Sequence, residues 1–393
     1  MPIPHLGELL AGGIRGRRVL VRADLNVPLR DDAIDDDTRI RASLPTLNRL
    51  LEAGARVIVV SHLGRPKGQR RPELSLRPVA ARLAALLDTG VSFCEECVGE
   101  PAEAAIRELG EGQLILLENL RFHEGEERND ADFARALADL ADVYVNDAFG
   151  TAHRAHASTV GVAGLLSQVA TGQLLRSELD HLGVIREPKR PLLVILGGAK
   201  VSDKLATLDA LAPHADTLAI GGAMAYTFLA SEGRAVGASR VEPGRIEDAR
   251  RVSQAALGAG RRLLLPRDHR VVERIQTGAP VKVAREIPDG WIGVDIGPET
   301  ARAYAEEASR ARTLFWNGPM GIFEIEAYAA GTETVANAVA ASEATTVVGG
   351  GDSLAAVNRL GLGHRIDHLS TGGGASLEYI RGHTLPAVAA LQR

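Results

Sequence analysis

The sequence is organised around one strand–turn–helix stretch, Leu196-Gly197-Gly198-Ala199-Lys200-Val201-Ser202-Asp203-Lys204. Residues 191–196 are an apolar run that predicts a buried parallel strand. The two glycines that follow permit a tight turn and a close approach of a ligand to the backbone. A helix should come next, which Ser202 or Asp203 can cap, with an apolar face made of Leu205, Leu208 and Leu211.

The two lysines of this stretch indicate an anion site. Lys200 and Lys204 lie in the first helical turn, where the helix dipole disfavours cations. Because backbone N–H groups at a helix N-terminus bind phosphate, an anion held between the lysines would explain them. The alternative is a solvated, basic helix start. A Walker A loop is excluded, because G-x-x-x-x-G-K-[ST] does not occur here.

The chain has 393 residues and a formal net charge of −5. This length predicts two domains of roughly 150–200 residues, and the charge gives no global basic field for nucleic acid or membranes. No apolar run approaches the ~20 residues of a membrane span, and the N-terminus lacks signal-peptide features. We interpret Cys94 and Cys97 as inert thiols, and a cytoplasmic location is the default expectation.

Strands that alternate with helices of ~10–15 residues predict doubly wound parallel sheets in both halves of the chain. In the first half, the expected strands end in polar loops at 23–28, 62–68, 118–123 and 146–156. Because the carboxyl ends of parallel strands share one edge of a sheet, these loops should converge. The converging side chains predict an anion site made of Arg39, His62, Arg65, Arg121 and Arg154, beside Asp24 and Asn26, which could bind hydroxyl groups.

A break separates the two halves. Residues 171–185 predict one long helix, which prolines at 188 and 191 end. We interpret residues 171–190 as a connector and hinge between an N-terminal domain, 1–170, and a C-terminal domain, 191–376. The short apolar segment 377–393 is expected to pack back on the N-terminal domain.

Glycine-rich loops follow the expected strands of the second half, at 221–224, 317–324, 349–353 and 371–376. Triple glycines expose backbone N–H groups to phosphate oxygens, and Gly221, Gly222 and Pro319 form apolar loop faces that suit a flat base. Tight turns without a ligand are the alternative reading of each glycine run. Several such loops on one sheet edge, together with Lys200 and Lys204, favour a nucleotide site.

At this point the chain resembles the phosphoglycerate kinase family along nearly its whole length. The ordered motifs that carry the resemblance are residues 22–28, 61–66, 118–122, 147–156, 197–204, 315–324, 349–353 and 370–376. The sequence departs from the family in Ala23-Asp24-Leu25, where the family usually has Val-Asp-Phe. It also departs in the unusually basic segment 265–270, for which the residues give no account.

The resemblance implies two Rossmann-like domains with a cleft between them. It also implies that the protein is a monomer. It implies reversible phosphoryl transfer from 1,3-bisphosphoglycerate to ADP with Mg²⁺, giving 3-phosphoglycerate and ATP. The phosphoglycerate would be held by Asp24, Asn26, Arg39, His62, Arg65, Arg121 and Arg154. The nucleotide would be held by Lys200, Lys204, Gly221, Gly222, Asn317, Pro319, Glu324, Gly350, Gly351, Asp352, Ser353, Gly372 and Gly373. The catalytic residues would be Arg39, Lys200, Gly351 and Gly374, and the Mg²⁺ ligand would be Asp352.

The implied chemistry needs no general base, because the nucleophile toward ATP is an ionised carboxylate. Catalysis then depends on positioning and neutralising the migrating group, with Arg39 and Lys200 supplying charge after domain closure. Two alternatives remain. A nicotinamide dehydrogenase would need G-x-G-x-x-G and a downstream acidic residue, which neither half shows convincingly. A non-catalytic nucleotide-binding protein of the same fold would be expected to have lost Lys200, Arg39 or Asp352.

Overall fold

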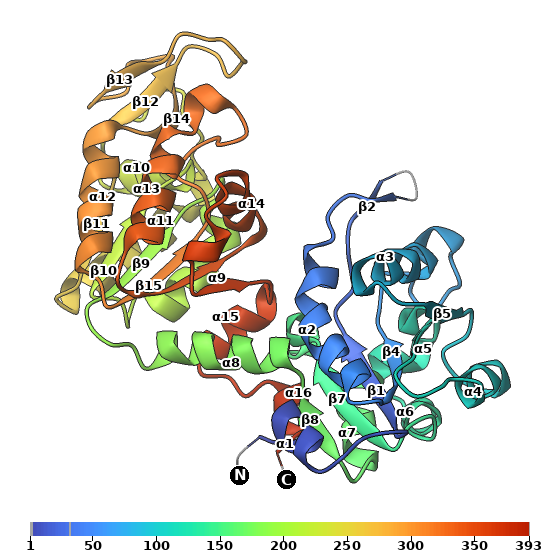
Figure 1. Cartoon of the computed structure of the whole chain (residues 1–393). Coiled ribbons are helices and arrows are strands. Elements are labelled where there is room, and N and C mark those ends of the chain that lie inside the picture. Colours follow the sequence, from blue (N-terminus) through green and yellow to red (C-terminus); the bar gives the residue numbers. More distant parts are fainter. Residues whose placement is uncertain (1–2, 31–32, 393) are drawn as a thin grey trace. The chain divides into compact units, whose positions relative to one another are not determined.

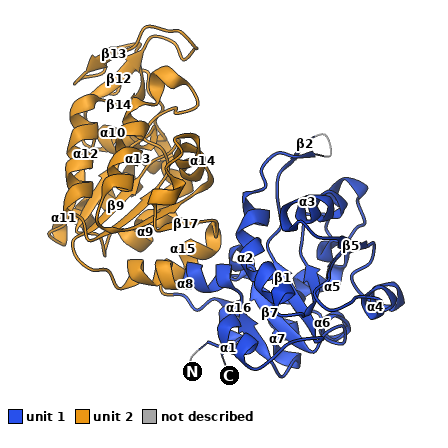
Figure 2. Cartoon of the chain, in the orientation of Figure 1, with its two compact units in different colours: residues 1–179, 383–393 blue, residues 180–382 orange. Residues whose placement is uncertain are grey.

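The computed structural model describes residues 3–30 and 33–392, and the chain forms two compact units. Unit 1 contains residues 1–179 and 383–393, and unit 2 contains residues 180–382 (Figure 2). The division falls inside helix α8 (Gln173–Arg186). The C-terminal residues group with unit 1, where the Ala387 N–H donates to the Ala152 carbonyl at 3.1 Å.

Unit 1 is built on a six-stranded parallel sheet. The strand order is β5 (Val91–Cys94), β6 (Leu114–Leu117), β4 (Arg56–Val60), β1 (Arg18–Ala23), β7 (Val143–Asp147) and β8 (Val169–Thr171). The central strands are near-continuous apolar runs that are buried along their length, which is typical of parallel strands covered on both faces.

The helices of unit 1 pack around this sheet (Figure 1). They are α1 (Leu6–Ala11), α2 (Thr38–Glu52), α3 (Arg77–Leu87), α4 (Glu100–Arg107), α5 (Glu124–Arg128), α6 (Ala131–Ala138), α7 (Val162–Leu165) and α16 (Pro386–Ala389). A two-stranded antiparallel pair, β2 (Leu29–Arg30) and β3 (Ala33–Ile34), precedes α2.

Unit 2 also has a six-stranded parallel sheet. Its strand order is β11 (Arg262–Leu264), β10 (Thr217–Ile220), β9 (Leu192–Leu196), β15 (Thr313–Asn317), β16 (Thr345–Gly349) and β17 (His368–Ser370). Numbered along the unit, this is the 3-2-1-4-5-6 order of dinucleotide-binding sheets. In that topology ligands bind outside the carboxyl ends of the strands where the order reverses, which here lies between β9 and β15.

The helices of unit 2 alternate with these strands along the chain (Figure 1). They are α9 (Val201–Leu211), α10 (Met224–Ser231), α11 (Ile246–Gly258), α12 (Pro298–Arg310), α13 (Ala330–Ala341), α14 (Gly351–Arg359) and α15 (Gly374–Ile380). A separate antiparallel sheet has the order β13 (Lys282–Ala284), β12 (His269–Val272) and β14 (Ile292–Ile296).

The predicted fold class, two doubly wound parallel-sheet domains, is confirmed. The helix predicted from residue 171 begins two residues later, because Thr171 ends β8 and pairs with β7. The sequence analysis missed β8, β12 and β13; a strand was expected within residues 289–298, where β14 lies, but not its antiparallel pairing. The strands β8 and β13 have three residues each, and a segment that short shows too little alternation to be recognised by period.

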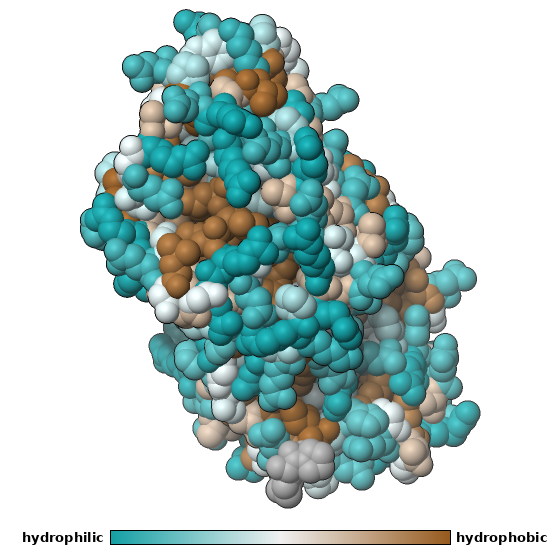
Figure 3. Space-filling view, turned by 90° about the vertical axis from the view of Figure 1, so that its left-hand side faces the viewer, coloured by the Kyte–Doolittle hydropathy of each residue, from teal (hydrophilic) through white to brown (hydrophobic). Residues whose placement is uncertain are grey.

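The surface carries separate apolar patches among hydrophilic side chains, as one face of the molecule shows (Figure 3). Among the described residues, the large apolar side chains that are exposed are Leu165, Leu257, Ile275 and Val283. In the part of the chain that the structure describes, no helix has both the length and the apolar character needed to cross a bilayer. Of the exposed apolar residues, Ile275 lines a cavity of unit 2 that is described below.

Candidate active site

The first group of candidate residues lies along the carboxyl edge of the unit 1 sheet. Asp24 follows β1, His62 follows β4, Arg121 lies in a short 3₁₀ turn after β6, and Arg154 follows β7. Because the four strands are parallel neighbours, their carboxyl ends share one edge of the sheet. The loops therefore converge, as the sequence pattern predicted.

Arg39, in the first turn of α2, is held against the loop after β1. Its Nη1 lies 3.3 Å from both carboxylate oxygens of Asp24 and donates to the Asn26 carbonyl at 3.1 Å. The Asn26 side-chain oxygen accepts from the Gly64 N–H at 2.8 Å, which ties this loop to the loop after β4. Asp24 is buried and Arg39 is half-buried, so the guanidinium is anchored on one side and open to solvent on the other.

His62 is buried, and its ring contacts a cation. The Arg22 Nη2 lies 3.2 Å from His62 Nδ1. Burial lowers the pKa of the imidazole well below its ordinary value, and the charges of Arg22, Arg121 and Arg39 lower it further. The ring is therefore neutral at physiological pH. Because a guanidinium can only donate, Nδ1 is the acceptor and the proton stays on Nε2.

Arg22 is fully buried and belongs to a network that the sequence analysis did not single out. Its Nε donates to Ser158 Oγ at 2.8 Å, and that hydroxyl donates to Glu126 Oε1 at 2.6 Å. Burial would raise the pKa of the Glu126 carboxyl, but the His156 hydrogen bond, the Arg22 charge and the Ser158 bonds outweigh it and lower that pKa. The network supplies the countercharge that a buried guanidinium requires.

Arg121 is 3 % exposed and has an unused donor. Its Nη1 donates to the Gly64 carbonyl at 2.8 Å, and its Nε lies 3.1 Å from Glu127 Oε1. Its Nη2 is buried and makes no hydrogen bond within the described residues. Burial lowers its pKa, Glu127 opposes that effect, and the Arg22 and Arg154 charges add to it. A buried donor without a partner costs about 1–3 kcal/mol, and an anionic ligand would satisfy it.

Two predicted arginines are less tightly held. Arg154 is half-buried and close enough to Arg121 to lower that side chain's pKa. Arg65 follows the same strand as His62 but is exposed. Among the described residues, it makes no hydrogen bond or ion pair with the other members of the group. The structure thus places Arg65 beside the cluster without fixing its side chain.

The second group of candidate residues lies at the carboxyl edge of the unit 2 sheet, where α9 begins. The prediction that Ser202 or Asp203 caps this helix is wrong, because Lys200 is the N-cap residue. The cap is supplied by Glu242, which accepts from the Ser202 N–H at 3.1 Å and the Ser202 Oγ at 2.7 Å. The first-turn N–H of Ser202 therefore has a protein partner and is not free for phosphate.

Lys204 points across the sheet edge toward β15. Its Nζ donates to the side-chain oxygen of Asn317, the last residue of that strand. Burial lowers the pKa of its ammonium, and the charges of Asp352 and Asp203 oppose this effect. Lys200 is half-buried, and no hydrogen bond or ion pair of its Nζ is found in the described part of the chain. Of the two lysines, Lys200 therefore has the ammonium group with fewer polar contacts.

The glycines of these loops are required by close backbone approach. A Cβ on Gly222, whose φ is +66°, would lie 2.5 Å from the Gly198 nitrogen. A Cβ on Gly221 would lie 2.3 Å from Met320 Sδ. The Gly222 N–H donates to the Met320 carbonyl at 2.9 Å. The loops after β9, β10 and β15 thus cross at the point where the strand order reverses.

Two further helices begin at the same sheet edge. Gly350, at φ +88°, precedes α14, and Gly373, at φ +52°, precedes α15. Gly351 and Gly374 are the first residues of these helices, and Gly372 lies in the loop before α15. A Cβ at Gly351 or Gly373 would meet nothing within 4 Å, so the space beside both is open. Ser353 is buried, and its Oγ accepts from the Gly318 N–H.

A cavity of about 290 Å³ opens beside these loops, within unit 2. Gly198, Gly222, Pro319, Glu324 and Asp352 contribute to its lining. Most of the remaining wall is apolar, and the carboxylates of Glu324 and Asp352 are exposed. A flat ring with a polar tail fits such a cavity.

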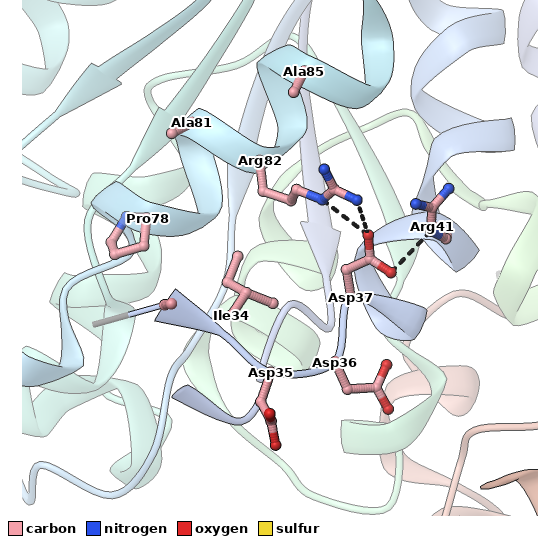
Figure 4. A pocket seen from close by; sticks show the side chains of 10 residues that line it. Ile34, Asp35, Asp36, Asp37, Arg41, Pro78, Ala81, Arg82 and Ala85 are labelled. Carbon is pink, nitrogen blue, oxygen red and sulfur yellow. Dashed lines mark hydrogen bonds and ion pairs between the residues drawn. The ribbon is translucent and has the colours of Figure 1, made fainter. Parts of the chain in front are cut away.

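Another cavity, of about 730 Å³, lies in unit 1 and includes none of the predicted site residues (Figure 4). Asp35 and Asp36 contribute to its polar lining together with Asp37, whose carboxylate accepts from Arg41 at 2.8 Å and from Arg82 at 2.6 Å. Burial would raise the pKa of Asp37, but the two arginines outweigh it and lower that pKa. We therefore interpret this hollow as a structural ion-pair site.

Known proteins resemble this chain over nearly its whole length. Residues 11–383 match the sequence profile of the family described as "Phosphoglycerate kinase". The chain belongs to the phosphoglycerate kinase family. Membership confirms the family, the fold and the kinase function predicted from the sequence, and nothing in the comparisons supports a non-catalytic relative.

The relatives cover the chain almost completely. The phosphoglycerate kinase of Moorella thermoacetica is 55% identical over 381 residues, which are 96% of this chain and 97% of that protein. The cytosolic phosphoglycerate kinase of Triticum aestivum is 49% identical over 394 residues, 98% of each chain. The solved structure of phosphoglycerate kinase from Coxiella burnetii matches with a TM-score of 0.88 and 38% identity, over 99% of each chain.

The donor set of this chain is compatible with Mg²⁺ held mostly by a nucleotide. Among the residues that the structure describes, no group of three or more His, Cys, Asp or Glu side chains could hold a metal ion by itself. Asp352 offers one exposed carboxylate at the edge of the unit 2 cavity. Mg²⁺ is commonly bound by one or two carboxylates together with substrate phosphates and water.

The sequence analysis missed the residues that hold the predicted ones in place. His62 is held by Arg22, which is bound in turn by the Ser158–Glu126 pair. Helix α9 is capped by Glu242 beside Lys200. Of these, Arg22 carried a signal, because an arginine inside an apolar strand must have a partner. The partners themselves lie up to 136 residues away in the sequence, so no local pattern reveals them.

Proposed function

We propose that this chain catalyses reversible phosphoryl transfer from 1,3-bisphosphoglycerate to ADP, giving 3-phosphoglycerate and ATP. The observation that carries the proposal is the buried Arg121 guanidinium with an unused Nη2, inside a cluster of cations at the edge of the unit 1 sheet. Such a donor needs an anion, and the family whose profile matches the chain is named for a phosphorylated carboxylic acid.

We assign the phosphoglycerate to unit 1. Arg121, Arg154 and Arg65 provide guanidinium groups that match phosphate oxygens. The neutral His62 donates from Nε2, because its Nδ1 faces Arg22. Asp24 and Asn26 bind the hydroxyl group of the substrate.

We assign the nucleotide to unit 2. The base occupies the cavity lined by Gly222 and Pro319, next to Gly221 in the chain, and the Glu324 carboxylate binds the ribose. The phosphates lie along the N-termini of α14 and α15, where backbone N–H groups favour anions. Lys204, whose ammonium is held by the Asn317 side-chain oxygen, neutralises the phosphates. The remaining phosphate donors are Gly350, Gly351, Ser353, Gly372, Gly373 and Gly374.

The reaction requires charge stabilisation and no proton transfer. The acceptor in the reverse direction is a carboxylate, which is ionised at neutral pH. Lys200 has no hydrogen bond or ion pair among the described residues, and Arg39 is open to solvent beside its contacts with Asp24 and Asn26; we assign both to the migrating phosphoryl group. Because they belong to different units, the proposal requires the units to close about residues 171–190 during turnover. Closure would also exclude the water that hydrolyses acyl phosphates.

The remaining assignments concern the metal ion, the oligomeric state and the location of the protein. Asp352 would hold Mg²⁺, which when bound neutralises phosphate charge. We propose that the chain acts as a monomer in the cytoplasm. The wheat relative that is named cytosolic supports that location.

A coupled assay tests the proposal directly. Purified full-length protein with 1,3-bisphosphoglycerate and Mg-ADP should form ATP, and Lys200→Met should lower turnover by about 10³-fold or more while both substrates still bind. Lys282→Met, a lysine on β13 outside the site, is the matched control and should keep full turnover. Absence of ATP formation by the wild type would refute the proposal.

A further inference from the structure

One charged residue in the unit 2 cavity has no role in the scheme above. Arg240 lines the cavity and is exposed. Its guanidinium makes no hydrogen bond, ion pair or ring contact with any described residue. The acidic groups of the same cavity, Glu324 and Asp352, are not paired with it either. An arginine that faces a ligand cavity without a protein partner is free to bind the ligand.

The surroundings of Arg240 indicate which part of a ligand it meets. Apart from Glu324 and Asp352, the side chains that line the cavity with Arg240 are apolar, among them Ile275, Ile292, Val294, Pro319 and Ile322. An apolar cavity of this kind accommodates a flat ring. In the proposed scheme the phosphates bind elsewhere, at Lys204 and the helix N-termini. A cation among apolar walls therefore meets an edge of the ring.

We propose that Arg240 binds the N7/O6 edge of a 6-oxopurine, so that guanine and hypoxanthine nucleotides gain a contact that adenine nucleotides lack. The inference rests on the proposed function, because it takes this cavity as the base subsite. A guanidinium is a fork of donors without an acceptor. Guanine presents two acceptors, N7 and O6, which match the fork. Adenine presents N7 and a donating amino group, which does not.

The effect is measurable as a ratio of kcat/KM values. A bidentate arginine contact to guanine discriminates by ~1–3 kcal/mol, and an exposed site belongs at the lower end. We expect Arg240→Met to lower the GDP-to-ADP ratio of kcat/KM about fivefold. The IDP-to-ADP ratio should fall equally, because hypoxanthine keeps N7 and O6 and lacks only the 2-amino group. A ratio measured on one preparation is independent of its folded fraction.

Two further variants separate a base contact from a phosphate contact. Arg240→Lys keeps the charge and loses the fork, so the GDP-to-ADP ratio should stay low. If Arg240 instead binds a phosphate, Arg240→Met would weaken all three nucleotides equally and Arg240→Lys would restore them, which would overturn the inference. Arg302→Met, an exposed arginine on α12 outside the cavity, is the control and should leave the ratio unchanged.

The assay also separates this inference from the proposed function. If the wild type forms no product with ADP, GDP or IDP, the proposed function fails. If the wild type turns over ADP but Arg240→Met leaves the GDP-to-ADP and IDP-to-ADP ratios as they were, only the role of Arg240 fails. A selective fall in both ratios supports the inference.

Discussion

At the scale of single residues, the candidate site depends on side chains that are held by buried partners. His62 presents Nε2–H because Arg22 occupies its Nδ1, and Arg22 is fixed in turn by Ser158 and Glu126. The ring is buried among cations, so protonating it would add a positive charge close to Arg22, Arg121 and Arg39. Because Nε2 of His62 already carries its proton, an anionic substrate can bind there without any proton transfer.

This arrangement predicts how His62 titrates. We expect His62 to stay neutral, with the proton on Nε2, throughout pH 6 to 8, since burial and the neighbouring arginines lower its pKa well below 6.5. The ¹⁵N chemical shifts of the imidazole nitrogens report both the tautomer and the protonation state. His62→Gln assigns the signal. A protonation midpoint near 6.5, or a proton on Nδ1, would contradict the account.

At the scale of elements, helix N-termini in unit 2 are capped by acidic residues distant in the sequence. Glu242 accepts from the first turn of α9, and Asp268 accepts from the Glu299 and Thr300 N–H groups of α12 at 2.9 and 2.8 Å. Each carboxylate also favours the positive end of a helix dipole. The α9 cap places an anion beside Lys200 and fixes the helix start that carries it.

Removing the α9 cap should destabilise the protein. We expect Glu242→Ala to lower the free energy of unfolding by about 1 kcal/mol, which is typical for a lost N-cap. Chemical denaturation followed by circular dichroism measures it. Glu286→Ala, an exposed glutamate in the same unit with no hydrogen bond or ion pair among the described residues, is the control and should change stability by less than about 0.5 kcal/mol. Equal stability of the two variants would argue against the cap.

The elements also show what can be predicted from sequence and what cannot. The apolar run 191–196 was predicted as a buried strand and forms β9, and the helix predicted at 171–185 forms α8 within two residues of its expected ends, because buried strands and long helices have strong local patterns. The cap of α9 was predicted wrongly, since the rule for caps considers only neighbouring residues and the actual partner lies 40 residues away. The three-residue strand β8 carries no period at all.

At the scale of the whole molecule, two parallel sheets of different strand order each present polar loops at a carboxyl edge. Parallel topology brings residues from distant segments together, so the clustering of His62, Arg121 and Arg39 could be predicted from strand order alone. The supporting network around Arg22 could not, because its members come from elements whose packing the sequence does not encode locally. Folding of each unit also buries carboxyl groups, and this links stability to pH.

Asp295 should make stability depend on pH. Burial raises its pKa to about 7, although the Gly331 and Ile296 N–H groups oppose this. The folded protein therefore keeps a proton that the unfolded chain loses near pH 4. Stability should fall by up to about 4 kcal/mol as pH rises from about 4 to about 7.

The variant Asp295→Asn tests this link. It cannot titrate, so its free energy of unfolding should decline less between pH 5 and 8 than that of the wild type. The difference between the two slopes is informative even if the amide lowers stability at every pH. Parallel curves over this range would show that Asp295 does not titrate as described.

The central claim is that phosphoglycerate binds at the unit 1 sheet edge and the nucleotide at the unit 2 sheet edge. Calorimetric titration of full-length wild type, Arg121→Met and Lys204→Met with 3-phosphoglycerate and with Mg-ADP tests it most directly. We predict that Arg121→Met weakens 3-phosphoglycerate binding about tenfold or more and leaves ADP binding unchanged, and that Lys204→Met does the reverse. Equal weakening of both ligands by either variant, or an exchange of the two effects, would contradict the claim.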